Sequence, residues 1–385
     1  MESQHEITLM HYLADLTDPR HTRGQRYAWS VILVVLCLAL VSGQKTVWAT
    51  AHWAFLHGRE IITALGLTLR RLPSVSTFYR ALRKVSIAEL EHRIAAYGQA
   101  VDAQDPVSGC IRGLQGELLR GQALDGKTLR GASAHGELVH LLSLVRHESG
   151  VTLTQARVDQ KTNEITGAPP LLAAQDLRGT VTTKDALLSQ RAIDQQILDQ
   201  GGDFLTVIKQ NQPDSWQAID QLFRATRLDP TDRRTYTYAE KGHGRRERRT
   251  LVSSTELNQY VRWPGVQQVL QRTCRRVHPK TGEVEEEVTY GLTSLSRQRV
   301  RLKHVEQFWR WHWTIENRDH YVRDVTLGED QCQVHTGSAA QALAALRNGV
   351  LTALRHQGWE SIASAVRHYG ASVQKALALI GAGAT

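Results

Sequence analysis

Residues 120 to 213 alternate between apolar strand-like segments and helical segments, and this succession constrains the fold more than any other feature of the chain. Three strand-like segments, separated by turns, come first, and two helix–strand pairs follow. The segments in order are GQALDGKTLRG, ELVHLLSLVRH, GVTLTQARVD, the helix APPLLAAQDL with Pro at its start, GTVTTKDA, the helix LLSQRAIDQQILDQG and DFLTVIKQNQ. The order β-β-β-α-β-α-β predicts an α/β fold in which three antiparallel strands precede crossover units.

Residues 1–105 predict a helical N-terminal domain. The strongly apolar run Trp29 to Gly43 is shorter than the roughly 20 residues that a membrane span needs. It also begins too far inside the chain for a signal peptide, so a buried helix is the better interpretation. The basic segment 72–85 fits either the second helix of a helix-turn-helix or an ordinary amphipathic helix.

Residues 214–299 break the strand–helix alternation and predict a β-rich insertion. A helix is expected at SWQAIDQLFRATRL, and strand-like segments follow around the basic stretch KGHGRRERRTLVSS and the turn PKTG. A long helix or helix pair is expected next, from Arg299 to Val325. The Ala- and Leu-rich segment after it predicts a packing helix, and residues 361–385 predict a helical tail.

The charge balance narrows the class of partner. The chain has 47 Lys and Arg against 38 Asp and Glu residues, a net charge of +9 and a pI of about 9.5. This excess favours a polyanion such as nucleic acid, although a merely basic soluble protein has the same composition. The four cysteines form no CxxC pair, so neither a zinc site nor a disulfide framework is indicated, and a reducing, cytoplasmic location is expected.

Three acidic residues stand where an ordinary solvated carboxylate is not expected. Asp125 lies within an apolar strand-like segment, Asp185 ends another at a β-to-α junction, and Glu316 lies among Trp, His and Arg. If the two aspartate strands are neighbours, their carboxylates can share divalent cations that activate a water or a 3′-hydroxyl. Each acid also has an ordinary interpretation: a turn residue for Asp125, a helix N-cap for Asp185 and a salt-bridge partner for Glu316.

The segment Gly121 to Thr128 fits the phosphate-loop pattern G-x-x-x-x-G-K-[ST]. A true phosphate loop follows a buried strand and opens a helix at its Lys. Here the matching residues themselves have the pattern of a strand, and a Gly-Ala-Ser turn follows within a few residues. Nucleotide hydrolysis is therefore not expected.

Several separated motifs resemble those of one enzyme family. The motifs are DPRHTRGQRY, LPSVSTFYRAL, LDGKTLRGA, VDQKTNEITGAPPLL, VTTKDALLSQ, DFLTVIKQNQP, GHGRRERR and HWTIENRDHYVRDVTLGED. In order and spacing they resemble the DDE transposases of bacterial insertion sequences, specifically the H-repeat-associated (ISAs-type) branch of the IS-four-like superfamily. The resemblance runs from about residue 10 to residue 355.

The resemblance implies a ribonuclease-H-like mixed-sheet core formed by residues 118–213 and 300–360. Asp125, Asp185 and Glu316 would be the catalytic and metal-binding triad, holding two Mg²⁺ or Mn²⁺ ions. The implied activity is metal-dependent strand cleavage at insertion-sequence ends and strand transfer into target DNA, as in cut-and-paste transposition. The expected partners are double-stranded DNA, as terminal inverted repeats and target, and further copies of the chain in a homo-oligomer on DNA. The alternative is a catalytically inactive or co-opted DNA-binding relic.

Further residues are predicted to contact DNA. The superfamily's helix signature, Tyr-x₂-Arg-x₃-Glu-x₆-Lys, corresponds here to Trp309, His312, Glu316 and Arg323, so the aromatic and basic characters mostly persist while the identities differ. The other predicted DNA-binding residues are Lys161, Asn163, Lys209, Asn211, Arg245, Arg249 and Asn317. Trp309, Trp311 and Trp313 could stack on an exposed base, but such a stripe is more often core, and at least one of them is expected to be core.

Overall fold

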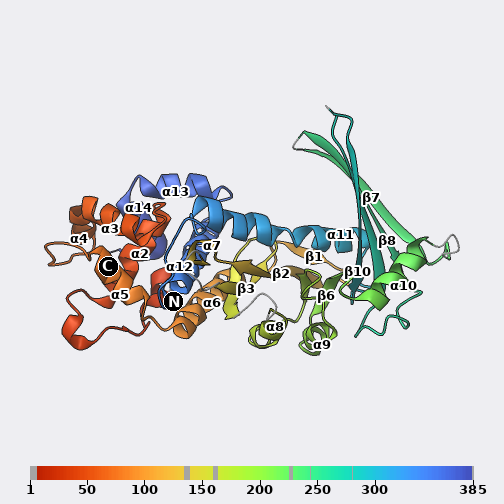
Figure 1. The fold of residues 1–385 in the computed structure, drawn as a ribbon, viewed down its shortest axis with the longest axis horizontal. Helices are drawn as coiled ribbons and strands as arrows, with labels where there is room; N and C mark the ends of the chain where they lie inside the picture. Colours follow the sequence, from red (N-terminus) through yellow and green to blue (C-terminus); the bar gives the residue numbers. More distant parts are fainter. Residues whose placement is uncertain are drawn as a thin grey trace. The chain divides into compact units, whose positions relative to one another are not determined.

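The computed structural model describes residues 7–133, 139–158, 164–224, 229–242, 244–279 and 281–383. The chain divides into two compact units, each assembled from segments that are distant in sequence. The helical unit comprises Met1–Pro106, Gly126–Glu164 and Thr314–Thr385, and the sheet unit comprises Val107–Asp125 and Ile165–Trp313. Strand β2 (Leu118–Thr128) runs through the boundary and contributes to both (Figure 1).

The helical unit is organised around two buried helices. In α2 (Trp29–Val41) every residue except Ser30 is buried, as its continuous apolar sequence predicts. It packs against α12 (Ala339–His356), whose alanines permit close approach, so the two form the interior of this unit. The remaining helices are α1 (Leu9–Leu13), the 3₁₀ turn Thr22–Gly24, α3 (Val47–Leu56), α4 (Gly58–Ala64), α5 (Val75–Leu82), α6 (Ile87–Gln104), α7 (Arg130–Ser133), α13 (Ile362–Gly370) and α14 (Val373–Ile380).

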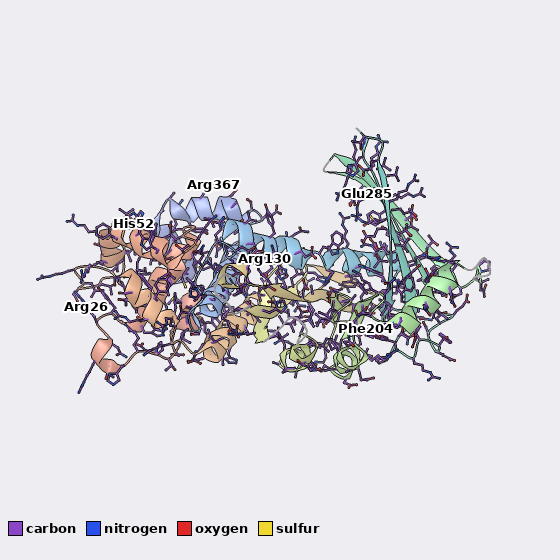
Figure 2. The ribbon with its side chains drawn as sticks, in the orientation of Figure 1. Arg26, His52, Arg130, Phe204, Glu285 and Arg367 are labelled. Atoms are coloured by element: carbon purple, nitrogen blue, oxygen red, sulfur yellow. The ribbon has the colours of Figure 1, made fainter. Side chains whose placement is uncertain are left out.

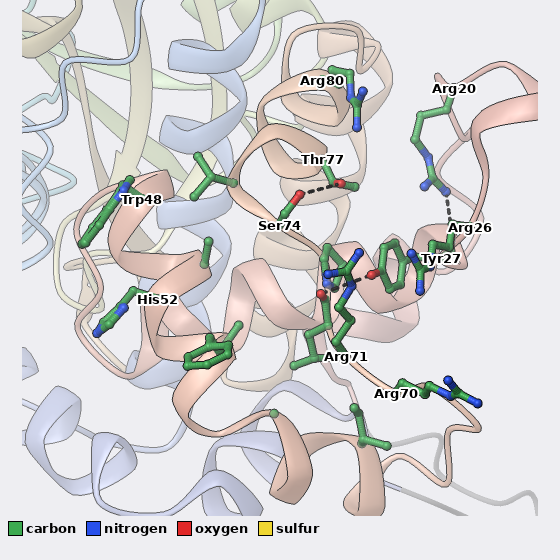
Figure 3. Close-up of a pocket in the computed structure, with 18 of the residues that line it drawn as sticks. Arg20, Arg26, Tyr27, Trp48, His52, Arg70, Arg71, Ser74, Thr77 and Arg80 are labelled. Atoms are coloured by element: carbon green, nitrogen blue, oxygen red, sulfur yellow. Dashed lines mark hydrogen bonds between the residues drawn. The ribbon is translucent and has the colours of Figure 1, made fainter.

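The N-terminal helices surround a cavity of about 870 Å³, drawn in Figure 3. Its walls come from α3, α4 and α5 and from the loops before α2 and α5. Within the described ranges, no helix combines the length and the apolar character that crossing a lipid bilayer requires.

Two strands and two π-helical turns complete the helical unit. Strand β3 (His140–Arg146) pairs antiparallel with β4 (Thr152–Val158), and α6 packs against β4. The helix expected after Trp311 continues as two π-helical segments, Ile315–His320 and Val322–Thr326. Such i→i+5 turns are rare and recur at functional sites.

The sheet unit contains the strands that carry the two aspartates. Strand β2 pairs parallel with β5 (Thr180–Lys184), and β5 pairs parallel with β6 (Asp203–Ile208). The sheet order is β4-β3-β2-β5-β6-β10-β9-β8-β7, with the short β1 (Cys110–Arg112) beside β2. The first five strands of this order give the predicted ribonuclease-H-like α/β core. The P-loop-like residues Gly121 to Thr128 lie within β2, as expected of a strand.

The predicted insertion extends the core sheet instead of forming a sheet of its own. Strand β10 (Val284–Thr293) pairs antiparallel with β6, and β9 (Gln268–Val277), β8 (Arg245–Ser254) and β7 (Arg234–Gly242) continue in antiparallel order. These strands form the long ribbon visible in Figure 1. The described helices of this unit are α8 (Glu164–Ala173), α9 (Arg191–Asp199), α10 (Pro213–Arg224) and α11 (Leu302–Trp311).

The predicted start of one helix is wrong. Helix α8 (Glu164–Ala173) contains Pro169 and Pro170 in its interior, where a helix with Pro at its first turn was expected. A proline has helical φ, but inside a helix it removes the hydrogen bond that its own N–H would donate and its ring crowds the carbonyl four residues earlier. Burial of Leu171 and Leu172 holds the helix in place despite that loss.

Helix α11 covers the sheet through an aromatic cluster. Phe308 and Trp309 pack on Val181 and Leu205, which lie in the two central parallel strands. A side chain at Gly291 of β10 would lie 2.6 Å from the Trp309 ring, so this position admits the indole only because it has no Cβ. Trp309 is therefore core, which confirms the expectation that at least one of the three tryptophans is buried in this way.

A buried ion pair joins the strand that carries Asp185 to the following helix. The ammonium of Lys184 contacts the carboxylate of Asp194 in α9, and both side chains are fully buried. The indole Nε1 of Trp263 donates a hydrogen bond of 2.8 Å to the other Asp194 oxygen. Figure 2 labels Phe204, whose ring lies 5.3 Å from the Lys184 ammonium.

We expect Asp194→Ala to lower the free energy of unfolding by about 3–5 kcal/mol, because it leaves the buried Lys184 charge without its partner. The matched control is Asp199→Ala in the same helix, where the carboxylate is exposed and a change below about 1 kcal/mol is expected. Urea denaturation of both variants measures the difference, and equal effects would contradict the role given to the ion pair.

Candidate active site

Asp125 and Asp185 lie at matching positions where the parallel pairing of β2 with β5 ends. Asp185 directly follows β5, whereas Asp125 lies within β2, which continues to Thr128. The register pairs Leu124 of β2 with Lys184 of β5, and each aspartate is the next residue along its strand direction. Both carboxylates are half-buried, whereas the strand residues before them are buried. Parallel pairing thus brings together two acids that are 60 residues apart in the sequence.

The Asp185 carboxylate is held in place by the backbone of the turn that follows it. One oxygen, Oδ1, accepts a hydrogen bond of 3.0 Å from the Leu188 amide, and the Asp185 carbonyl accepts one of 2.7 Å from the Ser189 hydroxyl. Asp185 therefore caps the turn before α9, and its interpretation as a helix N-cap is wrong because the N-cap of α9 is Gln190. A carboxylate has a second oxygen, so the cap fixes the group without using all its acceptors.

A cavity of about 580 Å³ adjoins the same strand end within the sheet unit. Ala186 and Leu187, which follow Asp185, line it together with Lys209 and Asn211 after β6. The amide of Asn211 donates a hydrogen bond of 2.6 Å to the Ala186 carbonyl, while Lys209 is exposed. The predicted DNA-binding residues Lys209 and Asn211 are thus brought next to the turn that carries Asp185.

Glu316 and Asn317 belong to the helical unit, in the first π-helical segment. Both side chains are exposed, and the neighbouring Ile315 and Asp319 are buried. Among the described residues, no hydrogen bond or ion pair engages the Glu316 carboxylate. The salt-bridge interpretation of Glu316 therefore finds no partner in the described part of the chain.

A buried polar chain, not anticipated from the sequence, begins at Thr128, three residues after Asp125. The carboxylate of Glu164 contacts His140 Nε2, and His140 Nδ1 lies 2.8 Å from the Thr128 hydroxyl. A Cβ at Gly126 would overlap the Glu164 carboxylate, so the Asp-Gly pair in LDGKT leaves room for it. Thr128, His140 and Glu164 are separated in the sequence. Only the succession of strands β2 and β3 suggests that their side chains meet.

A second buried network surrounds the end of the π-helical region. Arg323, which is fully buried, lies 2.9 Å from Glu329 and 3.4 Å from Asp319, and Lys127 lies 3.6 Å from Glu329 and also contacts Asp324. Burial works to raise the pKa of Glu329. The positive charges of Arg323, Arg347 and Lys127 outweigh burial and hold that pKa below its ordinary value.

Four of the predicted DNA contacts are committed to the protein interior. Trp309 lies in the core of the sheet unit, Arg323 in the network just described, and buried His312 has its Nδ1 2.9 Å from the Thr183 hydroxyl. Arg249 is buried between Glu240 and Glu247. In this structure these four side chains support the residues around them and are not presented to a ligand.

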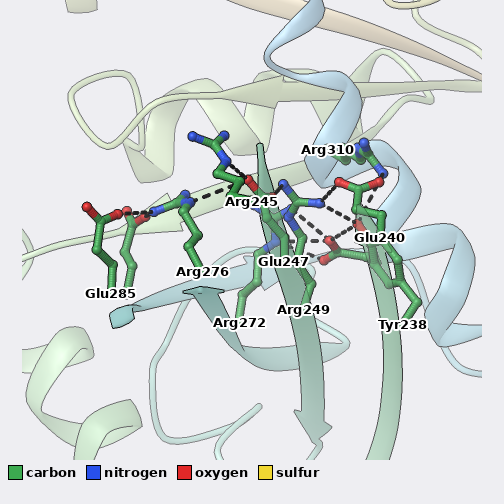
Figure 4. A network of polar contacts seen from close by, with 11 residues as sticks. Tyr238, Glu240, Arg245, Glu247, Arg249, Arg272, Arg276, Glu285 and Arg310 are labelled. Carbon is green, nitrogen blue, oxygen red and sulfur yellow. Dashed lines mark hydrogen bonds and ion pairs between the residues drawn. The ribbon is translucent and has the colours of Figure 1, made fainter. Parts of the chain in front are cut away.

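The basic cluster of β8 is balanced by acidic partners, as Figure 4 shows. Arg245 and Arg249 both contact Glu247, and Arg310 of α11 lies 2.6 Å from Glu240. Arg245 and Arg249 are therefore neutralised within the protein, whereas Arg246 and Arg248 of the same strand are exposed. Lys161 and Asn163 lie outside the described residues.

Comparisons with known proteins identify the family. A model of the transposase DDE domain matches residues 117–353, and a model of the region associated with that domain matches residues 10–97. This chain belongs to the DDE transposase family. The Escherichia coli protein YbfL is 30% identical over 344 residues, which cover 88% of each chain. The H repeat-associated candidate transposase YhhI of the same organism is 25% identical with the same coverage, and places the chain in the H-repeat-associated branch.

A solved structure of the piggyBac transposase synaptic complex with hairpin DNA is a more distant match. It has a TM-score of 0.41 and 10% identity, and the match covers 97% of this chain and 76% of that one.

The strand-end carboxylates suit the divalent metal that the family implies. Magnesium in proteins is held by one or two carboxylates, and waters and substrate phosphate oxygens complete its shell. Asp125 and Asp185 supply two such groups side by side. Among the described residues, no group of three or more His, Cys, Asp or Glu side chains could hold a metal ion. Asp125 and Asp185 therefore provide two carboxylates on neighbouring chain segments, and no third such ligand among the described residues joins them.

Acid should destabilise the fold through His312. Burial lowers the pKa of His312 to about 4 from 6.5, although the charge of Asp185 opposes this. Because the folded pKa lies below the unfolded one, the unfolded chain takes up the proton first, and stability falls as the pH drops from about 6.5 to 4. We expect a loss of about 3 kcal/mol from this group alone.

The variant His312→Gln removes this titration. Urea denaturation in chelator-treated buffer at several pH values should show a smaller pH dependence for the variant than for the parent chain. Parallel pH profiles for the two proteins would show that His312 titrates normally in the fold.

Proposed function

We propose that this chain is a DNA transposase that cleaves DNA strands at the ends of an insertion sequence and joins the freed ends to target DNA. The observation that supports the proposal best is the register between β2 and β5, which aligns Asp125 of β2 with Asp185, the residue that follows β5. Membership in the DDE transposase family and the net charge of +9 support the same conclusion. Paired carboxylates in a basic protein suit chemistry on a phosphodiester.

In this proposal Asp125, Asp185 and Glu316 bind two divalent cations, Mg²⁺ or Mn²⁺. When bound, these cations lower the pKa of an attacking water or 3′-hydroxyl and stabilise the leaving oxygen. The carboxylates of Asp125 and Asp185 neutralise the cations and fix their positions. Glu316 is proposed as the third acid because its segment matches the family's catalytic-Glu helix, and its carboxylate is exposed and without a described partner.

Residues around Asp185 would hold its carboxylate in position. The Leu188 amide fixes the orientation of the carboxylate, and the hydrogen bond from Asn211 to Ala186 fixes the turn. Lys209, exposed at the neighbouring strand end, would meet the DNA phosphates near the scissile bond. Asn317 and Arg245, both near the surface, are proposed as secondary DNA contacts.

We expect Asp185→Asn and Asp125→Asn each to reduce strand cleavage at least about a hundredfold, because even groups that only support a metal ligand cost 10- to 100-fold when removed. DNA binding should persist. The assay is cleavage of a duplex containing the DNA that flanks the coding region, with magnesium present or chelated. Asp176→Asn is the matched control, because this aspartate is exposed and pairs only with neighbouring Arg178.

Cleavage by the Asp185→Asn protein at the parental rate would refute the site. A second candidate, the inactive DNA-binding relic, predicts binding of the same duplex without metal-dependent cleavage by the parent chain. The same assay therefore separates the two functions.

A further inference from the structure

The cavity of the N-terminal helices carries a strong positive charge and no negative one. Arginine and lysine side chains enter its lining from three places in the sequence, while no Asp or Glu side chain lines it. The exposed cationic residues of the lining are Arg26, Arg59, Arg70, Arg71, Arg80 and Lys84. A concave surface lined by one sign of charge concentrates counterions of the opposite sign.

These six cations have no acidic partner in the described ranges, although the Arg26 guanidinium lies 5.6 Å from the centroid of the Tyr27 ring. None of their charged groups has a hydrogen bond or ion pair with any residue in the described ranges. This contrasts with Arg245 and Arg249 of β8, which Glu240 and Glu247 neutralise. Like charges gathered without acidic partners repel each other, so their arrangement is favourable only when an anion joins them.

A buried donor adds an independent sign of a missing ligand. Arg20 lines the same cavity with its side chain about nine-tenths buried, and it pairs with Asp18 and with the Tyr27 carbonyl. Its Nη1 is buried and has no hydrogen-bond partner among the described residues. Leaving a buried charged donor unsatisfied is costly, and a bound acceptor would remove that cost.

Exposed aromatic rings border the charges. Trp48 stacks on His52, with ring centroids 5.5 Å apart, and still exposes 63% of its surface. Phe55, two helical turns beyond Trp48 in α3, is 79% exposed. Figure 3 shows Trp48 and His52 on one side of the cavity and Arg26 and Arg71 beside Tyr27. Exposed aromatics beside a basic groove are the combination that holds unpaired bases.

We propose that this cavity binds DNA, with the cations on consecutive phosphates and an unpaired base against Trp48. The identity of the polyanion as DNA rests on the proposed transposase function. A volume of about 870 Å³ exceeds what contact with a smooth phosphate backbone requires, and suits an extruded or frayed nucleotide. The cavity would therefore hold a distorted or open DNA segment in addition to the DNA bound by the strand-end carboxylates.

The charge part of the proposal is tested by salt dependence. The full-length chain carrying Asp185→Asn, which prevents cleavage, is titrated with a short duplex of the flanking DNA between about 50 and 200 mM salt. Adding Arg70→Gln and Arg71→Gln should lower affinity at least about tenfold at 0.1 M salt and reduce the slope of log K against log salt by about 1.8.

The matched control changes two exposed cations of the same unit that do not line the cavity, Arg367→Gln and Lys375→Gln (Arg367 is labelled in Figure 2). It should keep the parental slope. Equal slopes for the cavity pair and the control pair would overturn the proposal. Thermal unfolding of both double variants confirms that neither has lost its fold.

The aromatic part is tested by Trp48→Ala. This variant should weaken binding of a duplex with an unpaired terminal base by about tenfold, and binding of the fully paired duplex much less, because stacking acts on the open base. Equal weakening of both duplexes would show that Trp48 does not stack on an unpaired base, and would contradict this part of the proposal.

These experiments distinguish failure of the cavity proposal from failure of the proposed transposase function. Intact metal-dependent cleavage together with unchanged binding by the cavity variants would reject the cavity alone. Salt-dependent binding through the cavity by a parent chain that never cleaves would reject the transposase chemistry alone.

Discussion

The candidate site depends on the parallel pairing of β2 with β5. In a parallel pair, residues in register have their side chains at the same level of the sheet, so the residues after Leu124 and Lys184 emerge together. That single register turns two isolated aspartates into a pair of carboxylates able to share a cation. A shift by one residue would turn one carboxylate to the opposite face of the sheet.

Buried charges hold this arrangement. In the sheet unit, the Lys184–Asp194 ion pair ties β5 to α9 immediately before Asp185, and Arg272 pairs with Glu306 below Trp309. In the helical unit, Arg323 and Glu329 anchor the π-helical region that follows Glu316. Such pairs are weak sources of stability, since the loss of hydration offsets their attraction, but breaking one leaves an unpaired buried charge. We infer that they specify positions more than they add stability.

Much of this architecture could be predicted from the sequence. Apolar runs bounded by turns identified β2 to β6. Asp125 stands out because a carboxylate in mid-strand is costly without a partner, and Asp185 because it ends a strand at a β-to-α junction. The commitment of Arg249 and Arg323 to the interior could not be predicted, since a sequence displays charge without showing which distant carboxylate meets it. The π-helical turns were missed because two turns are too short to distinguish their period from that of an α-helix. The Thr128–His140–Glu164 chain depends on contacts that no local pattern reveals.

The most direct test is to locate manganese in crystals of the chain bound to flanking DNA, from its anomalous scattering. The account predicts manganese between the carboxylates of Asp125 and Asp185, at about 2.1 Å from an oxygen of each. Manganese bound elsewhere, with both aspartates free of metal, would contradict it.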